Sequence, residues 1–323
     1  FSHAQIPDYK TFGCEIIKTS QPIMVELGKN AHAVKEPKWK DIPWSGTINK
    51  GAYFYWYAKP LHNYYHTLLD SLGCLFHYFH LKFDHPNLVL LLNKNHRNLD
   101  KWPPYVKELL DILNIPFQYT DEHAVYENVY FGATLNQSED GKRITPQPGQ
   151  FIILEQLVNN ALDLNLDVPR FDNIYISRRT KHNIKYSKDL IGEDNTQKRG
   201  NVDEDKVVQI LEDLGYNEIF GENYTLAEKI TMFHHMKKYV TNSGAGITNT
   251  FYRKKGIIGG IGSPGLEFPD KSKHGRHMIY NPYFKNKVSI YKDTSFAQSH
   301  NQGYNNPWKI NNIDNFAKWA KEL

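Results

Sequence analysis

Two residues suited to proton transfer stand four positions apart in the segment that begins at Asn63. On a helix, His66 and Asp70 would share one face, where a carboxylate can orient an imidazole or hold its charge. Either group could then take a proton from a nucleophilic hydroxyl. Pairs of this spacing are also ordinary on helix surfaces, so a purely structural pair is the alternative interpretation.

A glycine-containing turn, Ser-Gly-Ala-Gly at 243–246, follows a short predicted strand at 238–241. Glycine lets the backbone approach a phosphate closely, and the free N–H groups at a helix start favour an anion. The turn could therefore hold a diphosphate. Because Gly-x-Gly alone is a weak signal, a tight strand-to-helix connection without a ligand is the alternative.

Three arginines could supply the positive charge that a diphosphate requires. Arg178 and Arg179 come directly after a predicted strand, and Arg199 ends a polar segment that begins at Lys181. A guanidinium can bind two phosphate oxygens at once. Taken singly, each arginine also fits a solvated surface charge.

The sequence gives little support for a bound metal. The run Asp203-Glu204-Asp205 resembles an Asp-x-Asp metal motif, but its predicted place at a helix start favours complementation of the helix dipole and solvated charge. Cys14 and Cys74 form no Cys-x-x-Cys pattern, and both are expected to be ordinary buried thiols.

Alternating strand and helix patterns surround these residues. The predicted helices cover 63–83, 105–113, 151–162, 203–214, 226–234 and 313–323, and the predicted strands cover 87–92, 117–120, 125–131, 173–177, 238–241 and 256–260. This alternation is typical of an α/β fold, and residues 165–172 form a plausible linker between two such series. We therefore expect two Rossmann-like layers facing across a cleft, with ligands bound beyond the carboxyl ends of the strands.

Composition narrows the classes of function. The 323 residues are 40% hydrophobic and 23% charged, which argues against a disordered chain. The formal net charge of +4 is too small to indicate a nucleic-acid partner. The aliphatic run Leu88–Leu92 is far shorter than the ~20 residues that span a bilayer, and the N-terminus carries no signal-peptide pattern. A soluble protein is expected, cytoplasmic rather than in the secretory lumen, and the richness in Asn, Lys and Tyr favours a microbial or viral source.

The ordered set of motifs resembles glycosyltransferase family 61 over residues ~60 to ~255. The N-terminal match is Asn63-x-x-His66-x-x-x-Asp70. The C-terminal match comprises Tyr175-Ile176-Ser177-Arg178, Arg199-x-Asn201-x-x-Glu204, Leu214-Gly215-Tyr216, Tyr224-Thr225-Leu226-x-Glu228 and Gly244-Ala245-Gly246-x-x-Asn249. The chain departs from the family pattern at Ser243, Lys229 and Val202, where the family usually has His, Gln and Glu. These departures bear on the donor sugar more than on the type of reaction.

This resemblance implies an inverting glycosyltransferase with a GT-B fold. The expected reaction moves a sugar, of the xylose or N-acetylglucosamine type, from a UDP-sugar to a hydroxyl of a glycan or glycoprotein, as in polysaccharide biosynthesis. Residues 1–165 would hold the acceptor and the catalytic base, residues 166–300 would hold the nucleotide sugar, and a final helix within 301–323 would pack back on the N-terminal domain. A non-catalytic nucleotide- or sugar-binding relative and another nucleotide-dependent transferase on a doubly wound fold are the alternatives.

The resemblance also suggests roles for single residues. Asp70 is the expected base, with His66 as its partner or as the alternative base. The expected donor-binding residues are Arg178, Arg199, Tyr224, Thr225, Lys229, Ser243, Gly244, Ala245, Gly246 and Asn249, and the expected acceptor-binding residues are Asn63, Tyr64 and Tyr65. Because positive side chains can neutralise the leaving diphosphate, no divalent metal or other cofactor is expected.

Overall fold

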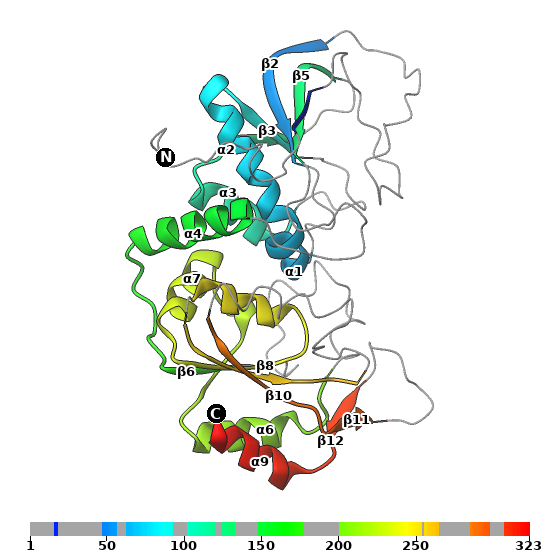
Figure 1. The fold of residues 1–323 in the computed structure, drawn as a ribbon, viewed down its shortest axis with the longest axis vertical. Coiled ribbons are helices and arrows are strands. Elements are labelled where there is room, and N and C mark those ends of the chain that lie inside the picture. Colours follow the sequence, from blue (N-terminus) through cyan, green and yellow to red (C-terminus); the bar gives the residue numbers. More distant parts are fainter. Residues whose placement is uncertain are drawn as a thin grey trace.

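The computed structural model describes two large β-sheets and the helices that cover them (Figure 1). The described residues are 16–18, 47–56, 63–92, 102–119, 124–132, 148–177, 200–253, 255–264, 285–297 and 307–323. A small sheet pairs β11 (Thr294–Phe296) with β12 (Trp308–Ile310). The alternation of helices with mostly parallel strands confirms the α/β class.

The first sheet has five strands in the order β1-β5-β2-β3-β4. These strands are β1 (Ile16–Lys18), β2 (Thr47–Tyr55), β3 (Val89–Leu92), β4 (Phe117–Tyr119) and β5 (Ala124–Gly132). Only the pair β1–β5 is antiparallel among them. In β3, Leu90 and Leu92 join one buried apolar cluster and Leu91 joins another. The unbroken apolar run therefore reflects a strand that is buried on both faces.

The connection from β2 to β3 holds the residues predicted as one helix at 63–83. It consists of α1 (Tyr64–His66), a π-helical turn η3 (Thr67–Ser71), a 3₁₀ turn η4 (Leu72–Cys74) and α2 (Leu75–Asp84). Gln150 Nε2 donates to two successive carbonyls of η3, and Trp56 Nε1 donates to the carbonyl of Ser71. These side chains compete for carbonyls of the regular helical ladder, which accounts for the break. A helical segment is confirmed, but a regular α-helix through Asp70 is wrong.

The second sheet is parallel throughout, in the order β10-β9-β8-β6-β7. Its strands are β6 (Asn173–Ile176), β7 (Asn217–Ile219), β8 (Lys238–Asn242), β9 (Ile257–Ile261) and β10 (Lys287–Tyr291). Counted along the chain, the spatial order is 2-1-3-4-5, which is a doubly wound arrangement. The order reverses between β6 and β8, so the carboxyl ends of these two strands are where a ligand is expected.

Helices cover both faces of the second sheet (Figure 1). On one face lie α6 (Glu204–Asp213) and α9 (Ile313–Glu322), and on the other lie α7 (Leu226–His235) and a 3₁₀ helix, η9 (Ala245–Tyr252). The sequence predicted that the final helix packs back on the N-terminal part of the chain. In the structure α9 lies beside α6 instead, and its Phe316 ring meets the Tyr291 ring of β10 at 5.3 Å between centroids. The apolar face of α9 is thus buried against the second sheet.

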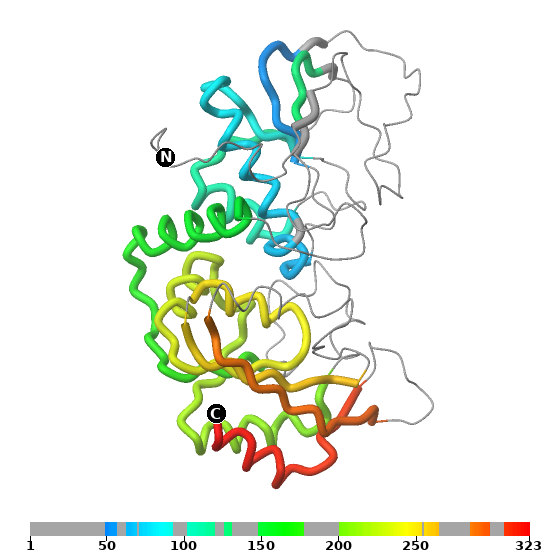
Figure 2. Tube along the Cα trace, in the orientation of Figure 1, coloured from blue at the N-terminus to red at the C-terminus, as the bar shows by residue number. Residues whose placement is uncertain are grey.

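The two sheets are joined through a shared apolar cluster. The helices α3 (Pro104–Ile112) and α4 (Pro148–Asp163) contact α7, and residues from all three belong to one buried cluster. Figure 2 follows the chain from α4 to the second sheet through residues 164–172, which form neither helix nor strand. In the described parts of the chain, no helix is long and apolar enough to cross a membrane.

Candidate functional site

Two chain segments leave the second sheet at the point where its strand order reverses. The strand β6 ends at Ile176 and is followed by Ser177, while the adjacent β8 ends at Asn242 and is followed by Ser243. Ser177 N donates to the Ile219 carbonyl at 3.1 Å, which extends the pairing with β7 by one residue. The predicted arginines Arg178 and Arg199 lie outside the described residues.

The turn after β8 has the geometry that glycine permits. Gly244 has φ +141°, a backbone conformation that L-residues with side chains rarely adopt. A Cβ at Gly246 would lie 2.9 Å from Thr241 Oγ1 and 3.4 Å from the Tyr239 hydroxyl, so the position has no room for a side chain. The Gly246 carbonyl accepts from Tyr239 at 2.7 Å and from Asn249 Nδ2 at 3.0 Å. The turn is therefore fixed by its surroundings before any ligand binds.

The predicted helix start after this turn is a 3₁₀ helix, η9, and not an α-helix. Ile247 N donates to the Gly244 carbonyl at 3.2 Å, so the N–H groups of Gly244, Ala245 and Gly246 precede the first bond of the helix. Such leading N–H groups have no acceptor inside the helix, and they form a natural anion site. The Ser243 hydroxyl donates to the Ile261 carbonyl at 3.0 Å, which employs this side chain in shaping the turn.

A buried carboxylate connects the two strand ends, although the sequence analysis gave it no role in the site. Glu204, at the start of α6, is 7% exposed and accepts from the Tyr175 hydroxyl at 2.5 Å and the Ser177 hydroxyl at 3.3 Å. Asn242 Nδ2 lies 3.2 and 3.1 Å from its two oxygens. Burial next to this carboxylate raises the pKa of Tyr175 well above its usual value, which keeps the phenol a donor. The interpretation of Glu204 as a solvated charge is wrong.

A signal for Glu204 was present in the sequence. Val207, Val208 and Leu211 form the buried face of α6, and Glu204 precedes them by three, four and seven residues. That spacing puts the carboxylate on the same face as the apolar side chains. Asp205, one residue later, is exposed in the first turn of α6, where the predicted interpretation as a dipole-complementing charge holds.

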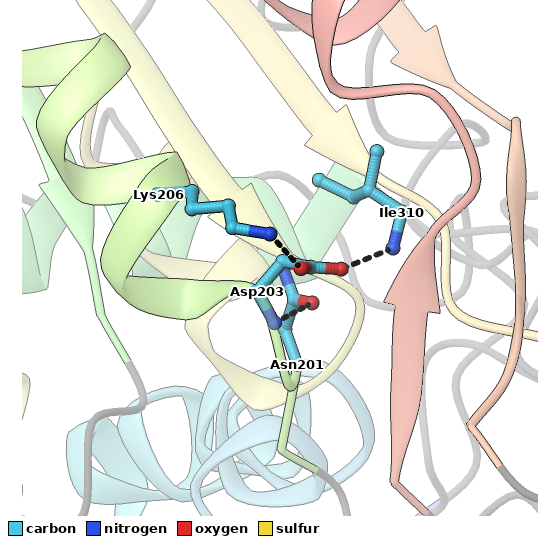
Figure 3. A network of polar contacts seen from close by, with 4 residues as sticks. All are labelled: Asn201, Asp203, Lys206 and Ile310. Carbon is cyan, nitrogen blue, oxygen red and sulfur yellow. Dashed lines mark hydrogen bonds and ion pairs between the residues drawn. The ribbon is translucent and has the colours of Figure 1, made fainter.

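The first acidic residue of the run, Asp203, has a structural role at the start of α6 (Figure 3). Asp203 accepts from Lys206 Nζ at 3.1 Å and from the backbone N–H of Ile310 at 3.2 Å, and its own N–H donates to Asn201 Oδ1 at 3.0 Å. These bonds tie the helix start to β12. Among the residues that the structure describes, no three or more His, Cys, Asp or Glu side chains gather in a way that could hold a metal ion.

The predicted base lies in the irregular segment after β2. Asn63 Oδ1 accepts from Tyr65 N at 3.1 Å and caps α1, and the half-buried His66 ring meets the Tyr65 ring edge-on at 5.1 Å. Asp70 lies in the π-helical turn η3, and only its backbone is among the described parts. π-Helical turns inside helices are frequent at functional sites.

Tyr64 brings this segment into contact with η9, one of the helices that cover the second sheet. Its hydroxyl donates to Asn249 Oδ1 at 2.9 Å and lies 2.5 Å from the Tyr252 hydroxyl. Burial and the neighbouring Tyr252 raise the pKa of Tyr64 well above its usual value, so the phenol stays protonated. Tyr64, which the sequence predicts to bind the acceptor substrate, is thus hydrogen-bonded to Asn249, which the sequence predicts to bind the nucleotide sugar.

A buried lysine lies against the same tyrosine. Lys229 Nζ is 4.7 Å from the centre of the Tyr64 ring, and the lysine is 9% exposed. Burial lowers the pKa of Lys229 to about 8, although the charges of Glu108, Glu222 and Glu228 act in the opposite direction. At neutral pH the ammonium group is therefore still mostly charged.

The remaining residues that the sequence predicts to bind the nucleotide sugar lie at the start of α7. The capping box predicted from the sequence is confirmed, because Thr225 Oγ1 accepts from Glu228 N at 3.2 Å while Glu228 Oε2 accepts from Thr225 N at 2.7 Å. This cap occupies the Thr225 hydroxyl. Tyr224 is half-buried and packs against the apolar cluster shared by the two sheets.

The comparisons with known proteins place this site in a sequence family. The family model described as Glycosyltransferase 61 matches residues 64–258 of the chain, which is more than half of its length. No curated protein matches the chain. The matched range begins at Tyr64 in α1, ends in β9, and includes both Glu204 and the turn at Gly244–Gly246.

Proposed function

Because the chain belongs to glycosyltransferase family 61, we propose that it is an inverting enzyme that transfers a sugar from a UDP-sugar to a hydroxyl of a glycan or glycoprotein. A xylose-type or N-acetylglucosamine-type donor is proposed from the family resemblance. The observation that carries the proposal is the rigid glycine turn, which follows β8 where the strand order of the second sheet reverses.

The donor diphosphate is proposed to bind at this turn. The N–H groups of Gly244–Gly246 would face the phosphate oxygens, and Arg178 follows Ser177 in the sequence at the end of the neighbouring strand. Arg199 and Lys229 would add positive charge. Hydrogen-bond donors that are held in place before the reaction stabilise the charge that develops on a leaving group. This stabilisation is often the largest contribution to catalysis. The proposed binding site for the nucleotide sugar also includes Tyr224, Thr225, Ser243, Ala245 and Asn249.

Asp70 is proposed as the base, with His66 as its partner or as the alternative. The base takes the proton of the acceptor hydroxyl while the hydroxyl oxygen attacks the anomeric carbon on the side opposite the diphosphate, so the configuration at that carbon inverts. The bond from the anomeric carbon to the diphosphate breaks, and UDP leaves. Asn63 and Tyr65, next to His66, are proposed to face the acceptor.

The proposed architecture is GT-B, with residues 1–165 and 166–300 as its two domains. The support is that each half of the chain has its own sheet with parallel strands, and that residues 164–172 between the halves form no helix or strand. The reaction is proposed to need no divalent metal, because the arginines and Lys229 supply positive charge. Turnover that survives excess chelator would support this, and turnover that is abolished and restored by Mn²⁺ or Mg²⁺ would contradict it.

A thermal unfolding series tests the function. UDP, UDP-xylose and UDP-N-acetylglucosamine should stabilise the protein, with about 2.7 kcal/mol expected at a hundredfold excess over the dissociation constant, whereas ADP and GDP serve as controls. With water as acceptor, the released sugar should first appear in the inverted configuration. Binding without UDP release would favour a non-catalytic relative. If no uridine nucleotide binds, the proposed function is wrong.

A further inference from the structure

The Tyr64 side chain links two parts of the proposed site that are far apart in the sequence. Tyr64 is the first residue of α1, two positions before His66 and six before Asp70. Its hydroxyl donates to Asn249 Oδ1 at 2.9 Å, across 185 residues of sequence. The segment that carries the proposed base is thus bonded to the helix that follows the glycine turn.

The bond continues from Asn249 to the turn itself. Asn249 is 3% exposed, and its Nδ2 donates to the Gly246 carbonyl at 3.0 Å. The Tyr239 hydroxyl donates to the same carbonyl at 2.7 Å, and Thr241 Oγ1 would lie 2.9 Å from a Cβ at Gly246, so β8 packs tightly against the turn. One side chain, Asn249, therefore separates the Tyr64 hydroxyl from a turn whose position is fixed on its other side.

The Tyr64 ring is held on two further sides. The Tyr105 ring of α3 meets it edge-on, with 5.3 Å between centroids. Lys229 Nζ, from α7, lies over its face at 4.7 Å, a cation–π contact that strengthens when the charge is desolvated. The phenol thus has contacts with α3, α7 and η9, and its hydroxyl bonds to Asn249 and lies 2.5 Å from the Tyr252 hydroxyl.

We propose that Tyr64 is a positioning residue, whose hydroxyl fixes the separation between the base-bearing segment 66–70 and the phosphate-binding turn 244–246. The proposal rests on the proposed function. The diphosphate and the base act on the same anomeric carbon from opposite sides. The distance between them must therefore accommodate the attacking hydroxyl, the anomeric carbon and the leaving phosphate oxygen in line. A displacement of about 1 Å in such an arrangement can cost about 10²-fold in rate. Tyr64 thereby acts on the rate through α1, without touching the substrate.

The test compares two variants that each lose one tyrosine hydroxyl. Tyr64→Phe removes the bond to Asn249 and the contact with the Tyr252 hydroxyl, which lies on the same helix η9, and keeps the ring under Lys229. Tyr78→Phe is the matched control, because Tyr78 is 1% exposed and its hydroxyl donates to the Leu88 carbonyl at 3.2 Å, within the first half of the chain. The measurements are the dissociation constant of UDP and the kcat of UDP release from whichever of UDP-xylose and UDP-N-acetylglucosamine the wild type turns over, with water as acceptor.

Tyr64→Phe should lower kcat by about 10- to 100-fold while the UDP dissociation constant changes by less than about threefold. Tyr78→Phe should lower the melting temperature to a similar degree and leave kcat unchanged. If the two variants have the same kcat, or if Tyr64→Phe weakens UDP binding as strongly as it lowers kcat, Tyr64 is not a positioning residue. A wild-type protein that neither binds UDP nor releases it from a UDP-sugar contradicts the proposed function instead.

Hydrogen exchange gives a second readout that needs no turnover. UDP added to the wild type should slow amide exchange in residues 64–71 as well as at the turn, because the Tyr64 bond transmits the ordering of the turn to α1. In Tyr64→Phe the slowing should remain at 244–249 and disappear at 64–71. Equal slowing of 64–71 in both proteins would overturn the proposal.

Discussion

Asn242 Nδ2 donates to both carboxylate oxygens of Glu204, at 3.2 and 3.1 Å, and so joins the end of β8 to the start of α6. The same carboxylate accepts from Tyr175 and Ser177 at the end of β6. The two strands between which the sheet order reverses are therefore held at their carboxyl ends by one buried acid. The segments that leave these ends are the ones proposed to bind the diphosphate.

Replacement of this acid should disturb both stability and donor binding. Glu204→Gln places an amide N–H₂ group against Asn242 Nδ2 and two hydroxyl donors, and a buried group left without its partner costs about 1–3 kcal/mol. Because Ser177 and Asn242 then lose their common anchor, the UDP dissociation constant should rise. Denaturant unfolding and UDP titration measure the two effects.

Asp205→Asn is the matched control for Glu204→Gln. Asp205 lies in the same helical turn but is exposed, so its replacement should change the free energy of unfolding by no more than about 0.5 kcal/mol. Equal effects of the two substitutions would mean that the carboxylate of Glu204 does not organise the strand ends.

A substitution at the glycine turn should act through a steric clash. In Gly246→Ala the new Cβ would lie 2.9 Å from Thr241 Oγ1 and 3.4 Å from the Tyr239 hydroxyl. Such overpacking typically costs about 1–3 kcal/mol, and the displaced turn should bind UDP more weakly. Thr241→Ala in the same chain removes the closest atom and should restore part of both losses.

Gly221→Ala provides the comparison for the turn. A Cβ at Gly221 would find only Ile176 Cδ1 at 3.9 Å, which is an ordinary contact distance. The free energy of unfolding and the UDP dissociation constant should therefore stay close to the wild-type values. If Gly246→Ala behaves in the same way, the tight fit of the turn has no energetic consequence.

Lys229 should make the stability of the protein depend on pH above neutrality. Burial lowers its pKa from 10.5 to about 8, so the folded protein holds this proton less tightly than the unfolded chain does. Protonation therefore opposes folding: the cost is fully present below about pH 8, falls as pH rises through the folded pKa, and vanishes above the unfolded value. Near pH 7 the shift corresponds to about 3 kcal/mol.

Lys229→Met removes the titrating group while keeping a chain of similar length. At pH 7 the variant should be more stable than the wild type, and the difference should shrink between pH 8 and 10.5. UDP binding should be weaker in the variant, because the proposed positive charge is lost. Parallel stability profiles of the two proteins over this range would show that Lys229 does not titrate in the folded state as described.

The sequence predicted the elements more fully than the site. Apolar runs such as Leu88–Leu92 and caps such as Thr225 with Glu228 are local signals, and the corresponding strand and helix lie where they predict. The irregular segment around Asp70 depends on Gln150 and Trp56, which are distant in sequence, so no local pattern indicates it.

The polar contacts of the site were predictable only in part. The burial of Glu204 could be read from its spacing to the apolar face of α6. The bond from Tyr64 to Asn249 crosses 185 residues and depends on how α1 meets η9, which periodicity does not encode. The sequence therefore indicated which residue types take part in the chemistry, while the structure was needed to pair them.

Removal of the proposed base gives the most direct test of the mechanism. Asp70→Asn keeps the size of the side chain, but an amide cannot take the proton of the acceptor hydroxyl as a carboxylate does. Loss of a general base typically costs about 10²–10⁴-fold in rate, so kcat should fall within that range while UDP binding is retained, since the proposed phosphate contacts lie on the second sheet. His66→Gln should lower kcat less if the imidazole only orients the carboxylate. A larger loss of kcat with His66→Gln than with Asp70→Asn would transfer the base role to His66. Unchanged turnover in both variants would remove the segment 66–70 from the chemistry. Tyr64 would then have no reason to hold α1 against the turn.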